Sequence, residues 1–195
     1  MPNDAAFQRR VLLSVLKLLE APAGPVLADY AEDAPPADGD AQGLVCPVSF
    51  AREADKDVID AFTREVEELQ PWHDRARERR AHTRIGLSKL EPAQAARVLA
   101  RFLREETIDP IDGLSAGDSI KLVCEDLRTY YYEAAAARPG TPDANAIQNW
   151  FWRATAGGRA FLELHRKCLA SSDASLQKLC ATSLVPRAVL LETAK

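Results

Sequence analysis

At 195 residues, the chain has the length of one domain and can bury a sizeable hydrophobic core. Its composition, 47% hydrophobic and 28% charged, is that of a globular protein and excludes a wholly disordered chain. No apolar run approaches the roughly 20 residues of a membrane-spanning helix, which excludes an integral membrane protein. The net charge of −4 disfavours nucleic acid as a general partner but leaves room for a local basic patch. We expect one helical domain over residues 1–195, with no membrane partner.

Residues 4–20 have features of both a targeting signal and a helix. Two arginines precede a largely apolar run of six residues, which Lys17 and Glu20 then interrupt. A signal peptide needs about 7–15 uninterrupted apolar residues. With a turn of about 100° per residue, four apolar side chains share one helical face: Leu12, Val15, Leu16 and Leu19. We therefore predict an amphipathic helix that packs in the core, and a cytoplasmic protein with reduced thiols.

The rest of the chain is patterned mainly for helices, with apolar residues at helical spacing and start signals before most segments. Pro71 is expected to end or kink one helix, because proline lacks an amide donor and clashes with the preceding turn. Strand signals are short and isolated. The sequence predicts an all-α bundle of six helices over about 4–20, 57–69, 72–80, 91–106, 115–137 and 141–170, a short helix from Ser172 or Asp173, and a C-terminal tail over 186–195.

The segment from 21 to 55 has no periodicity, is rich in proline and glycine, and carries acidic residues without a lysine or arginine before Arg52. A connection this long is usually functional or disordered. Cys46 lies in it, outside the helical patterns, and its thiol would be reactive if a cation or a helix N-terminus favoured the thiolate. A simpler interpretation is that residues 45–48 anchor the loop on the core. The other three cysteines lie in helical segments, where we expect small buried hydrophobes.

Basic charge is concentrated between residues 75 and 104. Nine lysines and arginines face only two glutamates there, a net charge of +7, so the rest of the chain carries −11. On the helix over 91–106, Arg97, Arg101 and Arg104 share one side. Arginine suits planar recognition of carboxylate or phosphate, which predicts an anionic partner or ligand. The alternatives are a solvated face or one neutralised by the protein's own acidic loop.

The helix over 141–170 carries one apolar stripe with His165 at its centre, and a histidine placed there is either hydrogen-bonded in the core or part of an internal pocket. If an aromatic pocket exists, the polar groups expected at it are Asp126, Tyr130 and His165, beside Trp150. Gly157 and Gly158 suggest close approach by another helix or a ligand. Trp152 falls on the opposite, polar side of the same helix and is expected to cap a neighbouring element or to form a contact surface.

Complete catalytic and metal-binding motifs are not found. The G-x-S-x-G pattern at 113–117 needs a parallel sheet to support it, and a helix N-cap at Ser115 explains it fully. Asp74, Glu78 and His82 recur at every fourth residue among arginines, which favours salt bridges over metal binding. We expect no cofactor and no metal, and assign no catalytic residue.

Three functional hypotheses remain. The first is a helical accessory protein that uses the arginine face, Trp152 and the acidic loop against a protein partner, or that forms a homo-oligomer. The second is a domain that binds a small anionic or aromatic ligand in an internal pocket around Tyr130, Trp150 and His165. The third is a thiol- or histidine-dependent enzyme that uses Cys46 or His165.

Overall fold

The computed structural model describes residues 5–32, 57–105, 107–139, 143–182 and 184–193. Within these residues the regular structure is entirely helical, which confirms the all-α prediction. The elements are α1 (Ala5–Lys17), the short 3-10 turn η1 (Leu18–Glu20), α2 (Val58–Arg80), α3 (Pro92–Glu105), α4 (Ala116–Ala137), α5 (Ala144–Ala154), α6 (Ala156–Ala170), α7 (Ala174–Thr182) and α8 (Arg187–Thr193). None of the helices in this part of the chain combines the length and apolarity needed to cross a bilayer.

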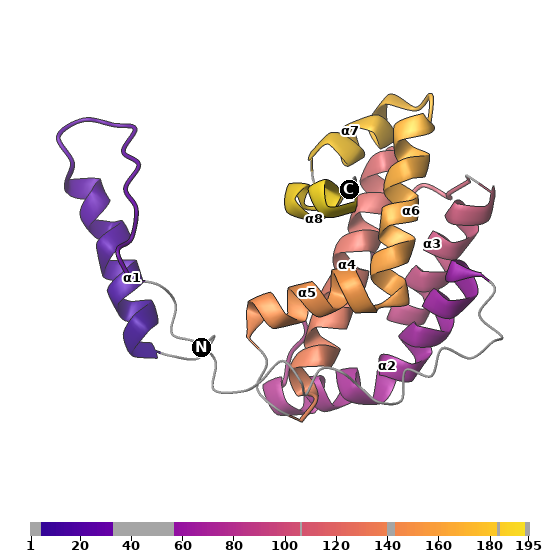
Figure 1. Ribbon diagram of the computed structural model, residues 1–195, viewed down its shortest axis with the longest axis horizontal. Helices are drawn as coiled ribbons and strands as arrows, with labels where there is room; N and C mark the ends of the chain where they lie inside the picture. Colours follow the sequence, from indigo (N-terminus) through magenta and orange to yellow (C-terminus); the bar gives the residue numbers. More distant parts are fainter. Residues whose placement is uncertain (1–4, 33–56, 106, 140–142, 183, 194–195) are drawn as a thin grey trace.

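Helix α4 lies at the centre of a helical body formed by α2 to α8 (Figure 1). It packs against α2, α3, α5 and α7, and α6 packs against α2, α3, α5 and α7. The inward face of α4 is fully buried along its length, as the apolar spacing of the sequence predicts. The side chains with no exposed area are Ile120, Val123, Leu127, Tyr130, Tyr131 and Ala134.

Helix α2 continues through Pro71, so the predicted separation into two helices was wrong. Proline removes one backbone hydrogen bond and normally kinks a helix. Here Pro71 itself is exposed, while buried side chains lie on both sides of it, Val66 and Leu69 before and His73 and Ala76 after. Packing of both halves of α2 against the body therefore outweighs the local cost of the proline. The helix ends at Arg80, and the residue that caps it, Ala81, has a left-handed φ of 56°.

The single helix predicted over 141–170 is divided at Thr155 into α5 and α6. Thr155 has an extended backbone, with φ −97° and ψ 153°. Its hydroxyl donates to the carbonyl oxygen of Phe151 at 2.6 Å and accepts from the amide of Gly158 at 2.8 Å. The same side chain thus ends α5 and caps the first turn of α6. A Cβ at Gly158 would lie 2.2 Å from the oxygen of Phe151, so the close approach expected at this glycine is made by the end of α5.

The N-terminal segment does not pack in the core, and this prediction was also wrong. None of the residues of α1 is buried, and the apolar face expected to be internal is exposed, with Leu12 at 62% and Leu19 at 81%. The chain from η1 to Glu32 returns along α1, where Tyr30 meets the Phe7 ring and Glu32 pairs with Arg10 at 2.8 Å. Figure 1 shows this arm, residues 5–32, standing apart from the body.

The predicted C-terminal tail contains a further helix, α8. Pro186 directly precedes it, a position where the missing amide donor of proline costs nothing. The Pro186 carbonyl oxygen accepts from the amides of Val189 and Leu190. Both of these side chains are partly buried against the core. Amphipathicity over so short a segment is a weak signal, so only packing against the body reveals this helix.

Candidate functional site

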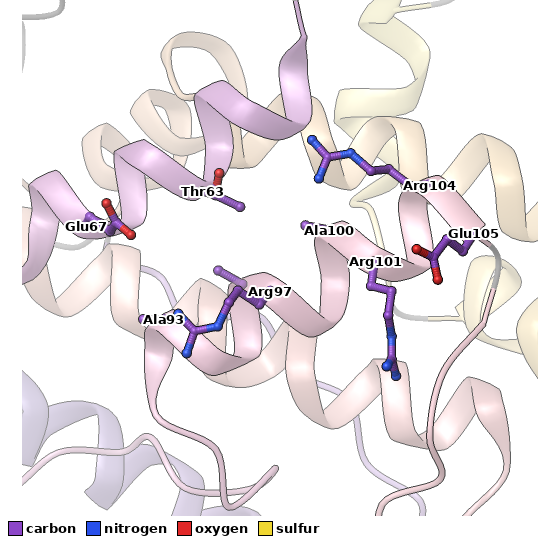
Figure 2. A pocket seen from close by; sticks show the side chains of 9 residues that line it. Thr63, Glu67, Ala93, Arg97, Ala100, Arg101, Arg104 and Glu105 are labelled. Carbon is purple, nitrogen blue, oxygen red and sulfur yellow. The ribbon is translucent and has the colours of Figure 1, made fainter.

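An open groove of about 390 Å³ lies between α2 and α3. Figure 2 shows its two walls: Thr63 and Glu67 project from α2, and three arginines together with Glu105 project from α3. The surface between the walls is formed by small side chains. The groove-lining residues are Thr63, Glu67, Ala93, Ala96, Arg97, Ala100, Arg101, Arg104 and Glu105.

The sequence of α3 explains how the arginines come to line this groove. Leu99, Phe102 and Leu103 are buried and fix the inner face of the helix on the body. Arg97, Arg101 and Arg104 recur at intervals of four and three residues, which places them on a common outer face. They are exposed or half-exposed, so the predicted sidedness of this helix is confirmed.

Two of the three arginines are bound by the protein's own carboxylates. Arg101 pairs with Asp109, which follows α3, at 2.5 Å. Arg104 bonds to Asp60 and, at 3.3 Å, to Asp57 at the start of α2. These hydrogen bonds raise the pKa of the Arg101 and Arg104 guanidinium groups above the ordinary arginine value. The protein therefore neutralises part of the arginine face itself, with carboxylates of residues 57, 60 and 109, which lie outside the acidic loop over 21–55 that the sequence suggested.

Arg97 differs from its two neighbours. It is exposed and makes no ion pair with any residue that the structure describes. The Nε of Arg101 is buried without a hydrogen-bond partner, so a ligand in the groove cannot reach it. The exposed guanidinium of Arg97, beside an alanine-floored groove, can donate hydrogen bonds to a planar anion such as a carboxylate.

Asp126 is buried, as expected of a pocket residue, but its carboxylate is fully engaged by the protein. Oδ1 accepts from the amides of Gly86 and Leu87 at 2.9 and 3.0 Å. Oδ2 accepts from the amide and the hydroxyl of Ser88 at 2.8 and 2.6 Å. The residue therefore anchors the loop between α2 and α3 to α4.

The other proposed pocket residues also contact the protein itself, and Tyr130 and Trp150 share the Tyr131 ring as a neighbour, with ring centroids 6.1 Å away in each case. The hydroxyl of Tyr130 donates to the carbonyl oxygen of Val66 at 2.6 Å. Trp150 lies near the Tyr131 ring and under the guanidinium of Arg138, which is 5.0 Å from the indole. His165 is buried, and burial lowers the pKa of its imidazole. None of Asp126, Tyr130, Trp150 and His165 lines the groove between α2 and α3.

The placement of Trp152 on a polar, accessible side was wrong. This indole is 5% exposed and packs edge-on against Phe151 and Phe161, with ring centroids 4.9 and 6.0 Å away. The helical periodicity that assigned it outward runs across the break at Thr155, where the spacing of about 3.6 residues per turn no longer applies. Its Nε1 is buried without a hydrogen-bond partner.

Three of the four cysteines lie in the part of the chain that the structure describes. Cys124, Cys168 and Cys180 are free and buried, as predicted. Burial raises the pKa of the Cys168 thiol to about 12, which favours the unreactive protonated form at neutral pH. Cys46 lies outside the described residues, so the reactive thiol stays a prediction.

Sequence reasoning missed the α2 wall of the groove. Thr63 and Glu67 lie about 30 residues before the arginines, and no pattern in the sequence pairs α2 with α3. A buried cluster was also missed, in which Glu133 accepts from Thr83 Oγ1 at 2.7 Å and from the amide of Arg84 at 3.0 Å, with His73 Nε2 at 3.2 Å. The glutamate within the helix over 115–137 was its only sequence signal.

Comparison of the chain with protein-family models, with curated proteins and with solved structures found no match. Over the described residues, no group of three or more histidines, cysteines and carboxylates is arranged to hold a metal ion. The class of protein is therefore defined by the fold and the site: an all-helical bundle with an arginine-lined groove between two surface helices.

Proposed function

We propose that the protein is a helical interaction module that binds a carboxylate-bearing segment of a protein partner in the groove between α2 and α3. The observation that carries the proposal is the exposed Arg97, which has no acidic partner in the described part of the chain and faces a groove with an alanine floor. A partner carboxylate would complete at Arg97 the kind of pairing that Arg101 and Arg104 already have.

The shape of the groove supports a peptide segment as the occupant. Ala93, Ala96 and Ala100 project little from α3, so a partner backbone can approach the helix closely. Thr63 on the opposite wall offers a hydroxyl, and Glu67 and Glu105 repel surplus negative charge. A segment with one or two acidic side chains therefore fits the local charge better than a continuous acidic run.

The test uses fluorescence anisotropy with two labelled peptides that differ only in carrying glutamate or glutamine at alternate positions. We expect the glutamate peptide to bind in preference to the glutamine peptide, with an affinity that falls as salt is added. Arg97→Glu should weaken this binding about tenfold or more, because it places a like charge beside the ligand. Free phosphate and acetate, added as competitors, test the small-ion alternative.

The matched control is Arg187→Glu, which makes the same change at an exposed position on α8. Equal binding of both peptides, or equal loss of affinity in the two variants, would contradict the proposal. Displacement of the peptide by millimolar phosphate alone would instead favour a small anionic ligand.

A further inference from the structure

The arm formed by residues 5–32 exposes an apolar stripe along α1 and η1. At about 100° per residue, four large apolar side chains fall within an arc of about 100° around the helix. We call these the arm stripe; they are 55–81% exposed and comprise Leu12, Val15, Leu16 and Leu19. Ala5 and Gln8 continue the arc toward the start of α1, and Leu13 lies outside it. We infer that the arm stripe is a dimerisation surface, which packs antiparallel against the arm stripe of a second copy of the chain.

The other side of α1 is covered by the arm itself. Phe7 and Leu18 are only partly exposed there. In the return segment of the arm, Tyr30 meets the Phe7 ring at 6.1 Å, and Glu32 pairs with Arg10 at 2.8 Å. Within the described part of the chain, by contrast, nothing buries the arm stripe. A helix of 13 residues is marginally stable in water on its own, so a second helix packed on the stripe would stabilise α1.

Charged residues beside the arm stripe favour an antiparallel second copy. Arg9 and Glu20 are exposed and border the same edge of the stripe, next to Leu16. In an antiparallel twofold pair, equivalent edges of the two helices face each other and every contact occurs twice. When the two stripes are centred on each other, Leu12 of one copy faces Leu19 of the other.

This alignment brings opposite charges together at both ends of the contact. Arg9 of one copy then lies only about 3 Å along the helix axis from Glu20 of the other, within reach of an arginine side chain. A parallel pair in register would separate the same two residues by roughly 16 Å along the axis. The antiparallel pair is therefore the arrangement in which the apolar stripes and the charges beside them are both complementary.

The charge of the arm favours a protein copy over a lipid surface as the occupant. Helices that lie on membranes combine an apolar face with an excess of lysine and arginine, which anionic lipids attract. The arm has three basic and three acidic residues and therefore no net charge: Arg9, Arg10, Lys17, Glu20, Asp29 and Glu32. Anionic headgroups would also repel the carboxylate of Glu20 at the edge of the stripe, whereas a second copy offers it a guanidinium group.

The arm stripe is separate from the groove between α2 and α3. The two surfaces share no residue, and Figure 1 shows the arm apart from the body that carries the groove. The inference therefore does not rest on the proposed function, and each can fail without the other.

The test measures the oligomeric state of the full chain by sedimentation equilibrium from micromolar to millimolar concentration. A reductant is present so that no disulfide can join two copies. We expect a reversible equilibrium between monomer and dimer. Leu12→Glu/Leu16→Glu should weaken dimerisation about tenfold or more, because it places charges in the apolar contact. Glutamate and leucine have similar helix propensities, so circular dichroism should show unchanged helicity.

The matched control is Leu169→Glu/Leu191→Glu, which makes the same change at leucines of α6 and α8 that are 57% and 59% exposed. This control should dimerise as strongly as the parent. A parent chain that stays monomeric at millimolar concentration, or equal weakening in the two double variants, would overturn the inference. Binding of a monomeric parent to phosphatidylserine vesicles would overturn it in favour of a lipid surface.

A charge exchange tests the antiparallel arrangement. Arg9→Glu and Glu20→Arg should each weaken dimerisation about threefold or more, because like charges then meet at both ends of the contact. An equimolar mixture of these two variants should recover the affinity of the parent, because opposite charges meet again. A mixture that associates no better than either variant alone contradicts the antiparallel pairing. Arg97→Glu should leave the dimer unchanged, and loss of the dimer in that variant would show that the groove joins the copies instead.

Discussion

Buried carboxylates link the loop between α2 and α3 to the central helix. Asp126 and Glu133 are seven residues apart on α4, which places them about two turns apart on one face. Between them they accept backbone hydrogen bonds from residues 84, 86, 87 and 88. Because a buried carboxylate needs hydrogen-bond donors, these contacts satisfy both the acids and the loop amides. The same contacts explain why Asp126 can be buried.

Glu65 is a third carboxylate with a structural role, and it gives a pH-dependent prediction. Its Oε2 accepts from the Gly157 amide at 2.9 Å and from the Tyr131 hydroxyl at 2.8 Å. Burial nevertheless raises the pKa of Glu65 above the ordinary value of 4.5. The folded state therefore holds this proton more tightly than the unfolded state. The stability that this proton contributes is present below the unfolded pKa and is lost as pH rises through the folded pKa.

We expect Glu65→Gln to remove this pH dependence, because glutamine keeps an acceptor for Gly157 but does not titrate. Urea unfolding at several pH values from about 4 to 7 should show the parent losing stability relative to the variant as pH rises. The exposed Glu67→Gln, on the same helix, is the control. A stability difference that stays constant over this range, or that changes in the opposite direction, would contradict the prediction.

At the scale of elements, local propensity and packing disagree at two positions. Pro71 should interrupt a helix, yet α2 continues because buried residues flank it on the same face. Thr155 lies in a segment with continuous helical periodicity, yet the chain turns there, and its hydroxyl satisfies groups of both α5 and α6. Because of this turn, Trp152 lies in the core and not on the outer face that continuous periodicity predicts.

The turn at Thr155 makes Gly158 essential. Replacement of glycine by alanine within a helix normally stabilises it by about 0.5–1 kcal/mol. Gly158→Ala should instead destabilise the protein by about 2 kcal/mol or more, because its Cβ would lie 2.2 Å from the Phe151 oxygen. Thermal unfolding tests this prediction, because the Tm of Gly158→Ala should fall and not rise. The comparison variant is Gly24→Ala, which meets no atom within 4 Å, and equal behaviour of the two variants would show that α5 does not approach α6 so closely.

At the scale of the whole molecule, the chain separates into a packed body and an exposed arm. The body buries a continuous core around α4, whereas α1 buries no residue. The arm nevertheless has internal contacts, including the Arg10 to Glu32 ion pair and the stacking of Arg10 over Phe7 at 5.7 Å. The exposed apolar face of α1, which includes Leu12 and Leu16, is typical of interaction surfaces.

This separation predicts different costs for the same leucine-to-alanine substitution. Leu127→Ala, at a fully buried position in α4, should cost about 2–5 kcal/mol of unfolding free energy. Leu16→Ala, at a position in α1 that is 56% exposed, should cost about 0.5 kcal/mol or less. Tryptophan fluorescence during urea unfolding reports the body alone, because all three tryptophans lie in α2 and α5. Similar costs for both substitutions would show that α1 packs on the body.

Charge at the same scale is divided between separate parts of the surface and does not form one continuous face. The predicted excess between 75 and 104 consists of the three groove arginines, two of which are paired internally, Lys89, which is paired with Asp112, and five exposed arginines in the last turns of α2 and the loop after it. The sequence predicts the excess because charge counts need no coordinates. It cannot predict the division, because Asp57, Asp60 and Asp109 reach the groove only through the packing of α2 and the loop after α3.

The amino-acid sequence by itself determined the helical class, the outward face of α3, the inward face of α4 and the burial of three cysteines. These properties follow from side-chain periodicity within one helix, which is a local quantity. Only the tertiary structure decided the continuity of α2 through Pro71, the turn at Thr155, the exposure of α1 and the partners of Asp126 and the groove arginines. The path of α2 and the partners of Asp126 and Arg104 depend on contacts between segments distant in sequence, where packing and hydrogen bonding outweigh local propensity. The turn at Thr155 combines local hydrogen bonds with a distant one, from the Gly157 amide to Glu65.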